Sequence, residues 1–338
     1  MALKIAVYGY DTDIGKLVFE TMEEQKLKVD DLFPLSPLSG EFDAVTLNGE
    51  NYMVKAADEF DFGSCDLALF LTTPDESSRL AHAAAAKGCT VIDASGLYSD
   101  DERIPLVIPE INPYDIKGVA ETRIAIPACA TATLLALCLQ PIADSFGLER
   151  VSATVMESVS GQGRLGTETL ARETARLLNG HDGDHEGFEA QVAFNLHTRI
   201  GKEGGNGYSE HENTVLAQLG RVLGAIPGGF DVTAVQVPVF YGHTASVHVD
   251  LSRSATADEF KAALSECPWI KLPSGDRMLT PVTDAVSERS VLCSRIRRHG
   301  KSGKAWSFIC MMDNTRRGEA VSVVEIAKLL EKQRNEHA

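Results

Sequence analysis

The chain has 338 residues, enough for about two domains, and its 44% hydrophobic content is ordinary for a folded globular protein. Disordered and fibrous classes are excluded on this ground. The 32 lysines and arginines against 48 aspartates and glutamates give a formal net charge of −16, which repels phosphate backbones and anionic lipid surfaces. We therefore expect no nucleic-acid partner.

The first part of the chain alternates short apolar strands with amphipathic helices. Strands are predicted at residues 4–8, 66–71 and 89–93, and helices at residues 14–22 and 77–87. This alternation is typical of an α/β protein with a parallel, doubly wound sheet. Such sheets bind their ligands beyond the carboxyl ends of the strands.

The apolar stretch from residue 124 to 143 contains no charged residue, so a membrane span has to be considered. We expect Pro127 and Pro141 to bracket its helical part, which then covers about 20 Å of a roughly 30 Å hydrocarbon core. A buried core helix is therefore predicted, with no membrane partner. The N-terminus does not resemble a secretory signal, and the 7 cysteines include no C-x-x-C pair, which favours a reducing cytoplasm.

The pattern changes after Pro127. Residues 150–155 and 232–240 are β-rich runs, and residues 245–251 alternate apolar with polar side chains, the period of a half-buried antiparallel strand. A helix over residues 317–332 is predicted to close the chain. The second part is thus predicted to be an α+β domain.

The segment from Gly9 to Gly15 lies where a nucleotide-binding loop is expected. Glycines in such a loop let the backbone approach a pyrophosphate, and the start of the next helix, here Asp13 and Ile14, offers N–H groups to the anion. Only the two outer glycines of the motif are present, and Asp11 and Asp13 repel phosphate. An ordinary strand-to-helix turn with an aspartate cap is the favoured interpretation of this segment alone.

Two further residues occupy positions suited to catalysis. Cys129 follows a strand and opens an apolar helix, an arrangement that lowers a thiol pKa and makes a nucleophile. His243 follows a break at Gly242 and could act as an acid or base. From spacing alone, a core-filling thiol and a structural histidine are favoured instead. His181 and His185 fall in a Gly/Asp-rich loop, and no metal site is predicted.

A series of short motifs runs in order along the whole chain. Its members are V-I-D-A-S-G (91–96), P-L-V-I-P-E-I-N (105–112), P-x-C-x-T (127–131), S-G-Q-G (160–163), A-F-N (193–195), P-V-F-Y-G-H (238–243) and D-N-T-R-R-G (313–318). In this order and spacing the series resembles the aspartate-semialdehyde dehydrogenase family. The resemblance is greatest to the family's Usg-type paralogues.

The resemblance implies a two-domain oxidoreductase of amino-acid biosynthesis. A Rossmann-type NAD(P)-binding domain would occupy residues 1–127, and an α+β catalytic and dimerisation domain residues 128–313. A C-terminal helix, residues 314–338, would return to the first domain. A homodimer formed through the second sheet is implied, with the alternating run 245–251 as a candidate surface.

In the family that the chain resembles, a cysteine thiolate adds to the aldehyde, hydride passes to NADP, and phosphate attacks the resulting thioester. Carried over, Cys129 is the nucleophile and His243 the general acid/base. Ser160 and Gly161 would line the nicotinamide site, with Asn314 nearby. The resemblance therefore implies a retained reaction centre.

The substrate-binding positions depart from the family. The family's arginine that binds the substrate carboxylate matches Gln236, and its arginine that binds phosphate matches Tyr98. Its glutamate and lysine fall near His211 and Thr214, and the glutamine beside the nucleophile matches Glu157. Because each charge-assisted hydrogen bond contributes roughly 1.5–3 kcal/mol, these changes disfavour aspartyl phosphate as a substrate.

The remaining departures concern the cofactor and the thiolate. Thr12 replaces the family's middle glycine, and the segment 36–40 holds no arginine for a 2′-phosphate, so the implied NADP or NAD site is weakened. A carboxylate near Cys129 disfavours the thiolate unless Glu157 is protonated or acts as the base.

Two functions stay open: an NAD(P)-dependent oxidoreductase acting on a small, less anionic aldehyde, and a catalytically degenerate dimeric scaffold or regulator. A thiol hydrolase that uses no nicotinamide is a third.

Overall fold

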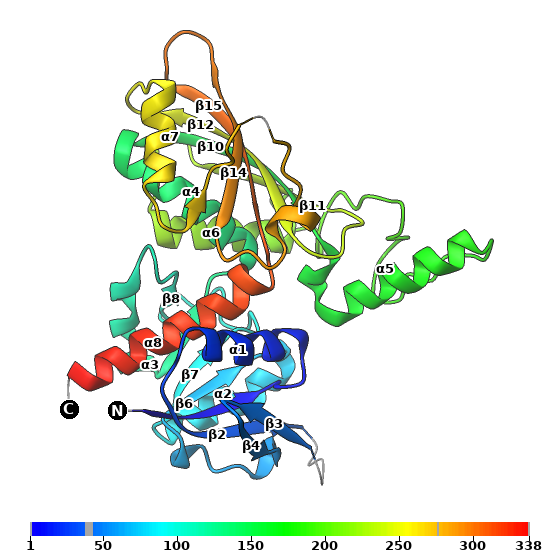
Figure 1. The fold of residues 1–338 in the computed structure, drawn as a ribbon, viewed down its shortest axis with the longest axis vertical. Helices are drawn as coiled ribbons and strands as arrows, with labels where there is room; N and C mark the ends of the chain where they lie inside the picture. The colour runs from blue at the N-terminus through cyan, green and yellow to red at the C-terminus, as the bar shows by residue number, and fades with distance from the viewer. Residues whose placement is uncertain (1, 38–42, 276, 337–338) are drawn as a thin grey trace. The chain divides into compact units, whose positions relative to one another are not determined.

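A computed structural model describes residues 2–37, 43–275 and 277–336 (Figure 1). The chain divides into two compact units, the first comprising Met1–Cys129 with Glu319–Ala338 and the second Ala130–Gly318. Residues 38–40 belong to the segment 36–40, which has no arginine for a 2′-phosphate, and they lie outside the described residues.

The first unit is built on a seven-stranded sheet in the order β5-β2-β1-β6-β7-β9-β8, in which every pair is parallel. Its strands are β1 (Leu3–Tyr8), β2 (Val29–Ser36), β5 (Lys55–Ala56), β6 (Leu67–Phe70), β7 (Thr90–Asp93), β8 (Leu106–Val107) and β9 (Ile124–Pro127). A hairpin joins β3 (Ala44–Leu47) to β4 (Glu50–Met53). The helices are α1 (Asp13–Glu24), α2 (Pro74–Ala86), α3 (Val119–Thr122) and α8 (Val321–Glu336), with short turns η1 (Ala57–Glu59), η2 (Phe62–Ser64) and η3 (Pro113–Gly118).

The central strands of this sheet are buried on both faces, as their continuous apolar runs predict. On one face, α1 and α8 lie side by side (Figure 1) and bury Val18 and Met22 of α1 with Val324 and Ile326 of α8. The predicted Rossmann-type doubly wound sheet is confirmed.

Helix α1 begins at Asp13, one residue before the predicted start, whereas two other helices of this unit begin further from their predicted starts. α2 begins at Pro74 because Thr73 and Glu76 form a capping box, in which each side chain bonds the backbone N–H of the other residue. The closing helix α8 begins at Val321, after a π-helical turn, η6 (Arg316–Ala320).

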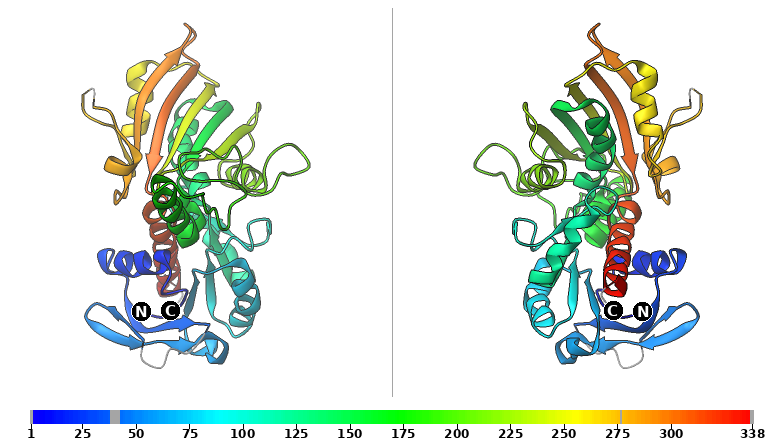
Figure 2. Two further views of the ribbon diagram at one scale, coloured as in Figure 1. Left: turned by 90° about the vertical axis from the view of Figure 1, so that its right-hand side faces the viewer. Right: turned by 90° about the vertical axis from the view of Figure 1, so that its left-hand side faces the viewer.

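The second unit holds a six-stranded mixed sheet in the order β11-β10-β12-β15-β14-β13. Its strands are β10 (Leu148–Glu157), β11 (Phe230–Gln236), β12 (His243–Leu251), β13 (Ile270–Lys271), β14 (Val291–His299) and β15 (Ala305–Met312). Its helices are α4 (Ala130–Phe146), α5 (Gly163–Leu178), α6 (Glu210–Leu223) and α7 (Ala257–Ser265), with short turns η4 (Val159–Gln162) and η5 (Pro281–Ala285). Helix α7 runs along one face of the long strands (Figure 2). The predicted α+β class is confirmed.

Strand β12 shows the predicted alternation. Ala245, Val247, Val249 and Leu251 are buried, whereas His248 and Asp250 are exposed. The predicted β run over residues 232–240 is wrong at its end, because β11 stops at Gln236. Pro238 has no N–H to donate to a sheet, which accounts for the early end.

The expectation that Pro127 and Pro141 bracket a helix is wrong at the second proline. Helix α4 continues through Pro141 to Phe146. A proline deprives the carbonyl four residues earlier, here that of Leu137, of its helical donor. The indole Nε1–H of Trp269 donates to this carbonyl at 3.1 Å, so the helix continues without an unsatisfied acceptor. None of the described helices is both long and apolar enough to cross a bilayer.

Candidate active site

The turn between β1 and α1 requires both of its outer glycines. Gly9 has a φ of +91°, and a Cβ atom there would lie 2.3 Å from the carbonyl oxygen of Leu71. A Cβ atom on Gly15 would lie 2.2 Å from the carbonyl oxygen of Gly9. The backbone therefore makes the tight turn at the carboxyl end of β1 that a dinucleotide-binding loop needs.

Thr12, and not an aspartate, caps α1. Its Oγ1 accepts from the Gly15 N–H at 2.9 Å and donates to the Gly9 carbonyl at 2.7 Å. One of the helix-end N–H groups that would face a phosphate is thereby already bonded. Asp13 lies in the first turn, next to Ile14, and Asp11 is exposed beside it. The shape of the loop suits a pyrophosphate, whereas its charge opposes one.

Tyr98 is a buried residue of the first unit. Its ring meets His82 edge to face, with 5.3 Å between centroids. Its hydroxyl has no hydrogen-bond partner in the described part of the chain. Burial, followed by the charges of Asp93 and Asp101, raises the pKa of Tyr98 to about 12. The side chain that the resemblance places at a phosphate-binding arginine is thus a neutral hydroxyl.

Cys129 is the last residue of the first unit's main segment. It stands between β9, which ends at Pro127, and α4, which begins at Ala130, and its side chain is partly exposed. The predicted position directly before a helix is therefore observed. A thiolate at a helix N-terminus is stabilised by the helix dipole.

His243 is the first residue of β12 and is 1% exposed. The backbone N–H of Ser158 donates to its Nδ1 at 3.2 Å, and the Ser158 hydroxyl lies 3.1 Å from the same atom. Because an N–H can only donate, Nδ1 carries no proton and the neutral ring holds its proton on Nε2. Burial lowers the pKa of His243, which agrees with this neutral form.

Asn314 holds the segments around His243 together. Its Oδ1 accepts from the Gly242 N–H at 3.0 Å and from the hydroxyls of Ser158 and Ser160 at 3.1 and 3.2 Å. Gly161 lies beside the imidazole, since a Cβ atom there would be 3.4 Å from the His243 Nε2. Ser160, Gly161 and Asn314, which the resemblance assigned to the nicotinamide site, are thus brought together near His243.

Glu157 ends strand β10 as a buried carboxylate between two histidines. Its Oε1 accepts from the His211 Nε2 at 2.7 Å and from the Thr131 hydroxyl at 2.5 Å. Its Oε2 lies 3.6 Å from the His243 Nε2. Thr214 does not join this group, because its hydroxyl donates to the Glu210 carbonyl within α6.

The contacts of Glu157 determine its charge. Burial by itself would raise the pKa of Glu157, but the charge and hydrogen bond of His211, the charge of His243 and the hydrogen bond of Thr131 lower it to about 2. Burial lowers the pKa of His211, but the charge and hydrogen bond of Glu157 outweigh burial and raise it. The two groups therefore favour each other's charged forms, the Glu157 carboxylate and the His211 imidazolium, beside His243.

Gln236 lies opposite Glu157 on the neighbouring strand β11. It lines a cavity of about 500 Å³ together with Gln162, Asn195, His197 and Arg199. Its side chain is 5% exposed, and among the described residues its Nε2 has no hydrogen-bond partner. A buried, unsatisfied amide N–H needs an acceptor, so this cavity wall is suited to an oxygen atom of a ligand.

Sequence reasoning missed two members of this site, Ser158 and Thr131. Thr131 belongs to the P-x-C-x-T motif, and Ser158 comes two residues before the S-G-Q-G motif. Proximity to these motifs was the available signal for both residues.

Comparison with known proteins agrees with the two-unit organisation. Residues 4–119 match the NAD binding domain of semialdehyde dehydrogenases, and residues 139–317 match their dimerisation domain. These matches define the class as an oxidoreductase with a nicotinamide-binding domain. The chain belongs to the aspartate-semialdehyde dehydrogenase family.

Individual relatives cover nearly the whole chain. It is 34% identical over 330 residues to aspartate-semialdehyde dehydrogenase 2 of Vibrio cholerae, covering 96% of this chain and 97% of the relative. It is 30% identical over 333 residues to a USG-1 protein homolog of Azotobacter vinelandii, with 98% of each chain covered. The crystal structure of aspartate semialdehyde dehydrogenase II from Vibrio cholerae complexed with ASA superposes with a TM-score of 0.94 at 32% identity, covering 98% of this chain and 99% of that one.

Proposed function

We propose that this protein is an NAD(P)-dependent oxidoreductase that acts on a small aldehyde or acyl compound less anionic than aspartate semialdehyde. The observation that carries the proposal is the buried cluster of His243, Ser158 and Asn314, which holds a neutral imidazole in one orientation. The Ser158 N–H fixes which ring nitrogen carries the proton, as acid–base catalysis requires. Cys129, before α4, is the proposed nucleophile.

The nucleotide loop fits a dinucleotide in shape, because a Cβ atom on Gly9 or Gly15 would clash with backbone oxygens. Gly9 to Gly15 would hold the pyrophosphate, and Ser160 and Gly161 would border the nicotinamide. The nicotinamide supplies a hydride acceptor when it is bound. Asp11 and Asp13 weaken the binding of the pyrophosphate and of any further phosphate, which favours NAD over NADP.

His243 would carry the protons of the reaction. With Nδ1 bonded to the Ser158 N–H, the proton on Nε2 is the one available to a substrate oxygen. Once this proton is given up, Nε2 becomes the acceptor for the next one, so the residue can serve as acid and then as base. Glu157 favours the protonated ring electrostatically, and His211 reduces this effect by neutralising the carboxylate.

The cavity beside Gln236 supports a substrate with a neutral oxygen at its far end. Gln236 offers an N–H to such an oxygen but no positive charge to a carboxylate, and the guanidinium of Arg199 in the same cavity is paired with Glu189 and Glu203. An amide, ester or hydroxyl group meets this requirement, whereas a carboxylate would lose the bidentate contact that an arginine provides. The substrate oxygen that accepts the Gln236 N–H is therefore expected to be uncharged.

The test is turnover followed by nicotinamide absorbance with a panel of small aldehydes that pair each carboxylate with its amide. We expect NAD reduction with at least one uncharged aldehyde, loss of about 10³-fold or more in Cys129→Ser, and a large loss in His243→Asn. Arg289→Lys is a control variant expected to retain turnover, because Arg289 is exposed and is not among the residues assigned to the site. No turnover with any aldehyde, together with Cys129 alkylating no faster than a free thiol, would contradict the proposal.

The cap formed by Thr12 favours a second candidate, a degenerate dimeric paralogue with a scaffold or regulatory role. Because the Gly15 N–H already donates to the Thr12 hydroxyl, a bound dinucleotide would have one backbone donor fewer. Calorimetry with NAD and NADP separates the two candidates, since micromolar binding of either counts against the degenerate one.

We propose a homodimer in both cases, formed through the sheet of the second unit, with Ser246, His248 and Asp250 on the surface involved.

A further inference from the structure

The thiols of Cys65 and Cys89 are in contact at the amino-terminal ends of two neighbouring strands of the first sheet. Cys65 precedes β6 and Cys89 precedes β7, and these strands pair in parallel with Leu67 opposite Thr90. The two Sγ atoms lie 3.3 Å apart. A disulfide bond is about 2.05 Å long, so the sulfurs need to approach by only about 1.3 Å.

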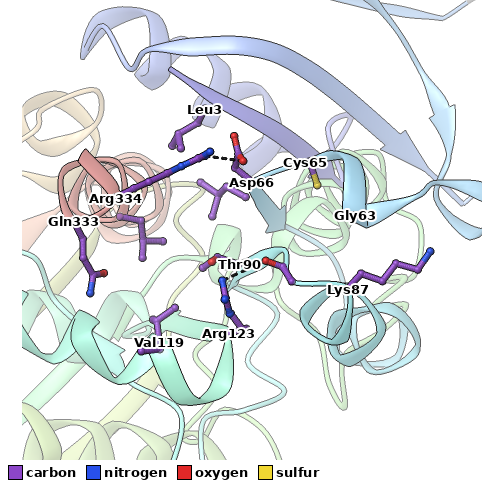
Figure 3. A pocket seen from close by; sticks show the side chains of 14 residues that line it. Leu3, Gly63, Cys65, Asp66, Lys87, Thr90, Val119, Arg123, Gln333 and Arg334 are labelled. Atoms are coloured by element: carbon purple, nitrogen blue, oxygen red, sulfur yellow. Dashed lines mark hydrogen bonds and ion pairs between the residues drawn. The ribbon is translucent and has the colours of Figure 1, made fainter. Parts of the chain in front are cut away.

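Cys65 is the less buried of the two residues and lines a cavity. Cys65 lines a cavity of about 640 Å³, whose walls also include Asp66, Arg123 and Arg334 (Figure 3). Cys65 is 7% exposed, whereas Cys89 is fully buried at 0%. A small oxidant that enters this cavity meets Cys65, whereas Cys89 does not line it.

The surroundings of the thiols suit a two-step oxidation. The Cys65 Sγ contacts the Phe62 carbonyl and the Cys89 Sγ contacts the Thr90 carbonyl, each at 3.4 Å. The contact with Cys65 and burial raise the pKa of the Cys89 thiol. Cys89 therefore stays protonated, so Cys65 is the thiol that reacts first with an oxidant.

We propose that Cys65 and Cys89 form a peroxide-responsive dithiol that closes to a disulfide between β6 and β7. In the first step, the Cys65 thiolate attacks one oxygen of hydrogen peroxide. The O–O bond breaks, a sulfenic acid forms, and the leaving hydroxide takes up the thiol proton as water. In the second step, the Cys89 sulfur attacks the sulfenic sulfur, the S–O bond breaks, and the hydroxide leaves with the Cys89 proton as water. Two thiols and one peroxide thus give one disulfide and two waters, independently of the reaction proposed at Cys129.

The disulfide would join the strand that supports the nucleotide loop to its neighbour. The enclosed segment contains β6 and α2, and β6 leads directly to Leu71, whose carbonyl lies against Gly9. Closing a loop of this length restricts the unfolded chain, and we expect the melting temperature to rise by about 5–10 °C on oxidation. A reductant such as dithiothreitol should reverse the shift.

The test uses the full chain in a Cys129→Ser background, which removes the partly exposed thiol of Cys129. After treatment with hydrogen peroxide, we expect an intact-mass loss of about 2 Da and a linked peptide pair that contains Cys65 and Cys89. Cys65→Ser should abolish the link. Cys89→Ser should leave a dimedone-reactive sulfenic acid on Cys65, a readout that does not depend on the stability of the disulfide.

A second thiol contact in the same chain provides a matched control. The Sγ atoms of Cys138 and Cys293 lie 3.5 Å apart, but both residues are 0% exposed. If proximity together with access controls oxidation, this pair stays reduced under conditions that link Cys65 to Cys89. Absence of the Cys65–Cys89 link in the folded protein, or linkage of Cys138 to Cys293 at an equal rate, would overturn the proposal.

Discussion

Replacing Glu157 by glutamine removes one charge from the centre of the second unit and keeps the shape of the side chain. In the folded protein the pKa of Glu157 is about 2, against an ordinary value of 4.5. A lowered pKa contributes stability that is present above the unfolded-state pKa and is lost as pH falls through the folded-state pKa. The difference of 4.5 − 2 = 2.5 corresponds to about 3 kcal/mol in the free energy of unfolding.

Most of this contribution should disappear within an accessible pH range. Between pH 5.5 and pH 3, linkage predicts that the wild type loses about 2 kcal/mol that the Glu157→Gln variant does not lose. His211 has a raised folded-state pKa, so its contribution is complete below its ordinary value of 6.5 and is lost as pH rises through the folded-state value. The variant should therefore be destabilised most between about pH 4.5 and pH 6.5.

The assay is urea unfolding of both proteins at half-unit pH steps from 3 to 8. Glu168→Gln is the control, because Glu168 pairs with Arg164 on the surface of α5 and its loss should change stability by less than about 1 kcal/mol. The reasoning is refuted if Glu157→Gln shows the wild-type slope between pH 3 and pH 5.5. An NMR titration in which the His211 imidazole titrates at the same pH in both proteins would contradict it independently.

Substitutions at four further positions test other parts of the structure. Gly15→Ala should weaken dinucleotide binding at least about 10-fold by calorimetry, because the new Cβ would lie 2.2 Å from a carbonyl oxygen, and an unchanged affinity would show that the loop is not the binding site. Asn314→Ala should cost at least about 2 kcal/mol in urea unfolding, since three buried donors lose their acceptor, whereas Asn314→Asp should cost less. Trp269→Phe should cost about 1 kcal/mol by removing the donor to the carbonyl that Pro141 leaves free, and a neutral result would refute that explanation of the continuous helix. Gln236→Arg should shift kcat/KM at least about 10-fold toward the carboxylate member of each aldehyde pair, and no shift would exclude Gln236 as the specificity residue.

The sequence predicted those features that depend on neighbouring residues. The alternation of apolar runs with amphipathic segments predicted the parallel sheet, since burial of both strand faces and of one helix face follows from local periodicity. The order of the short motifs indicated the family. The two outer glycines of the first loop could also be recognised, because a turn from strand to helix restricts the residues allowed within a few positions.

The contacts that define the candidate site were less accessible to sequence reasoning. Glu157 was singled out as a departure from the family, but its charge state depends on His211, which is 54 residues away along the chain. The protonation of His243 depends on Ser158, 85 residues away. The helix continues through Pro141 because Trp269, 132 residues from Leu137, replaces the missing donor. Local pattern carries no information about such distant partners.

By itself the sequence therefore determined the fold class, the family and the identity of the residues that could react. Only the tertiary structure decided which of them are charged, which are neutral and which face a cavity. The reason is that burial and long-range hydrogen bonds change protonation by amounts that no local pattern encodes. At Glu157 those distant contacts outweigh burial, so a side chain that the sequence left either protonated or ionised is ionised in the folded protein.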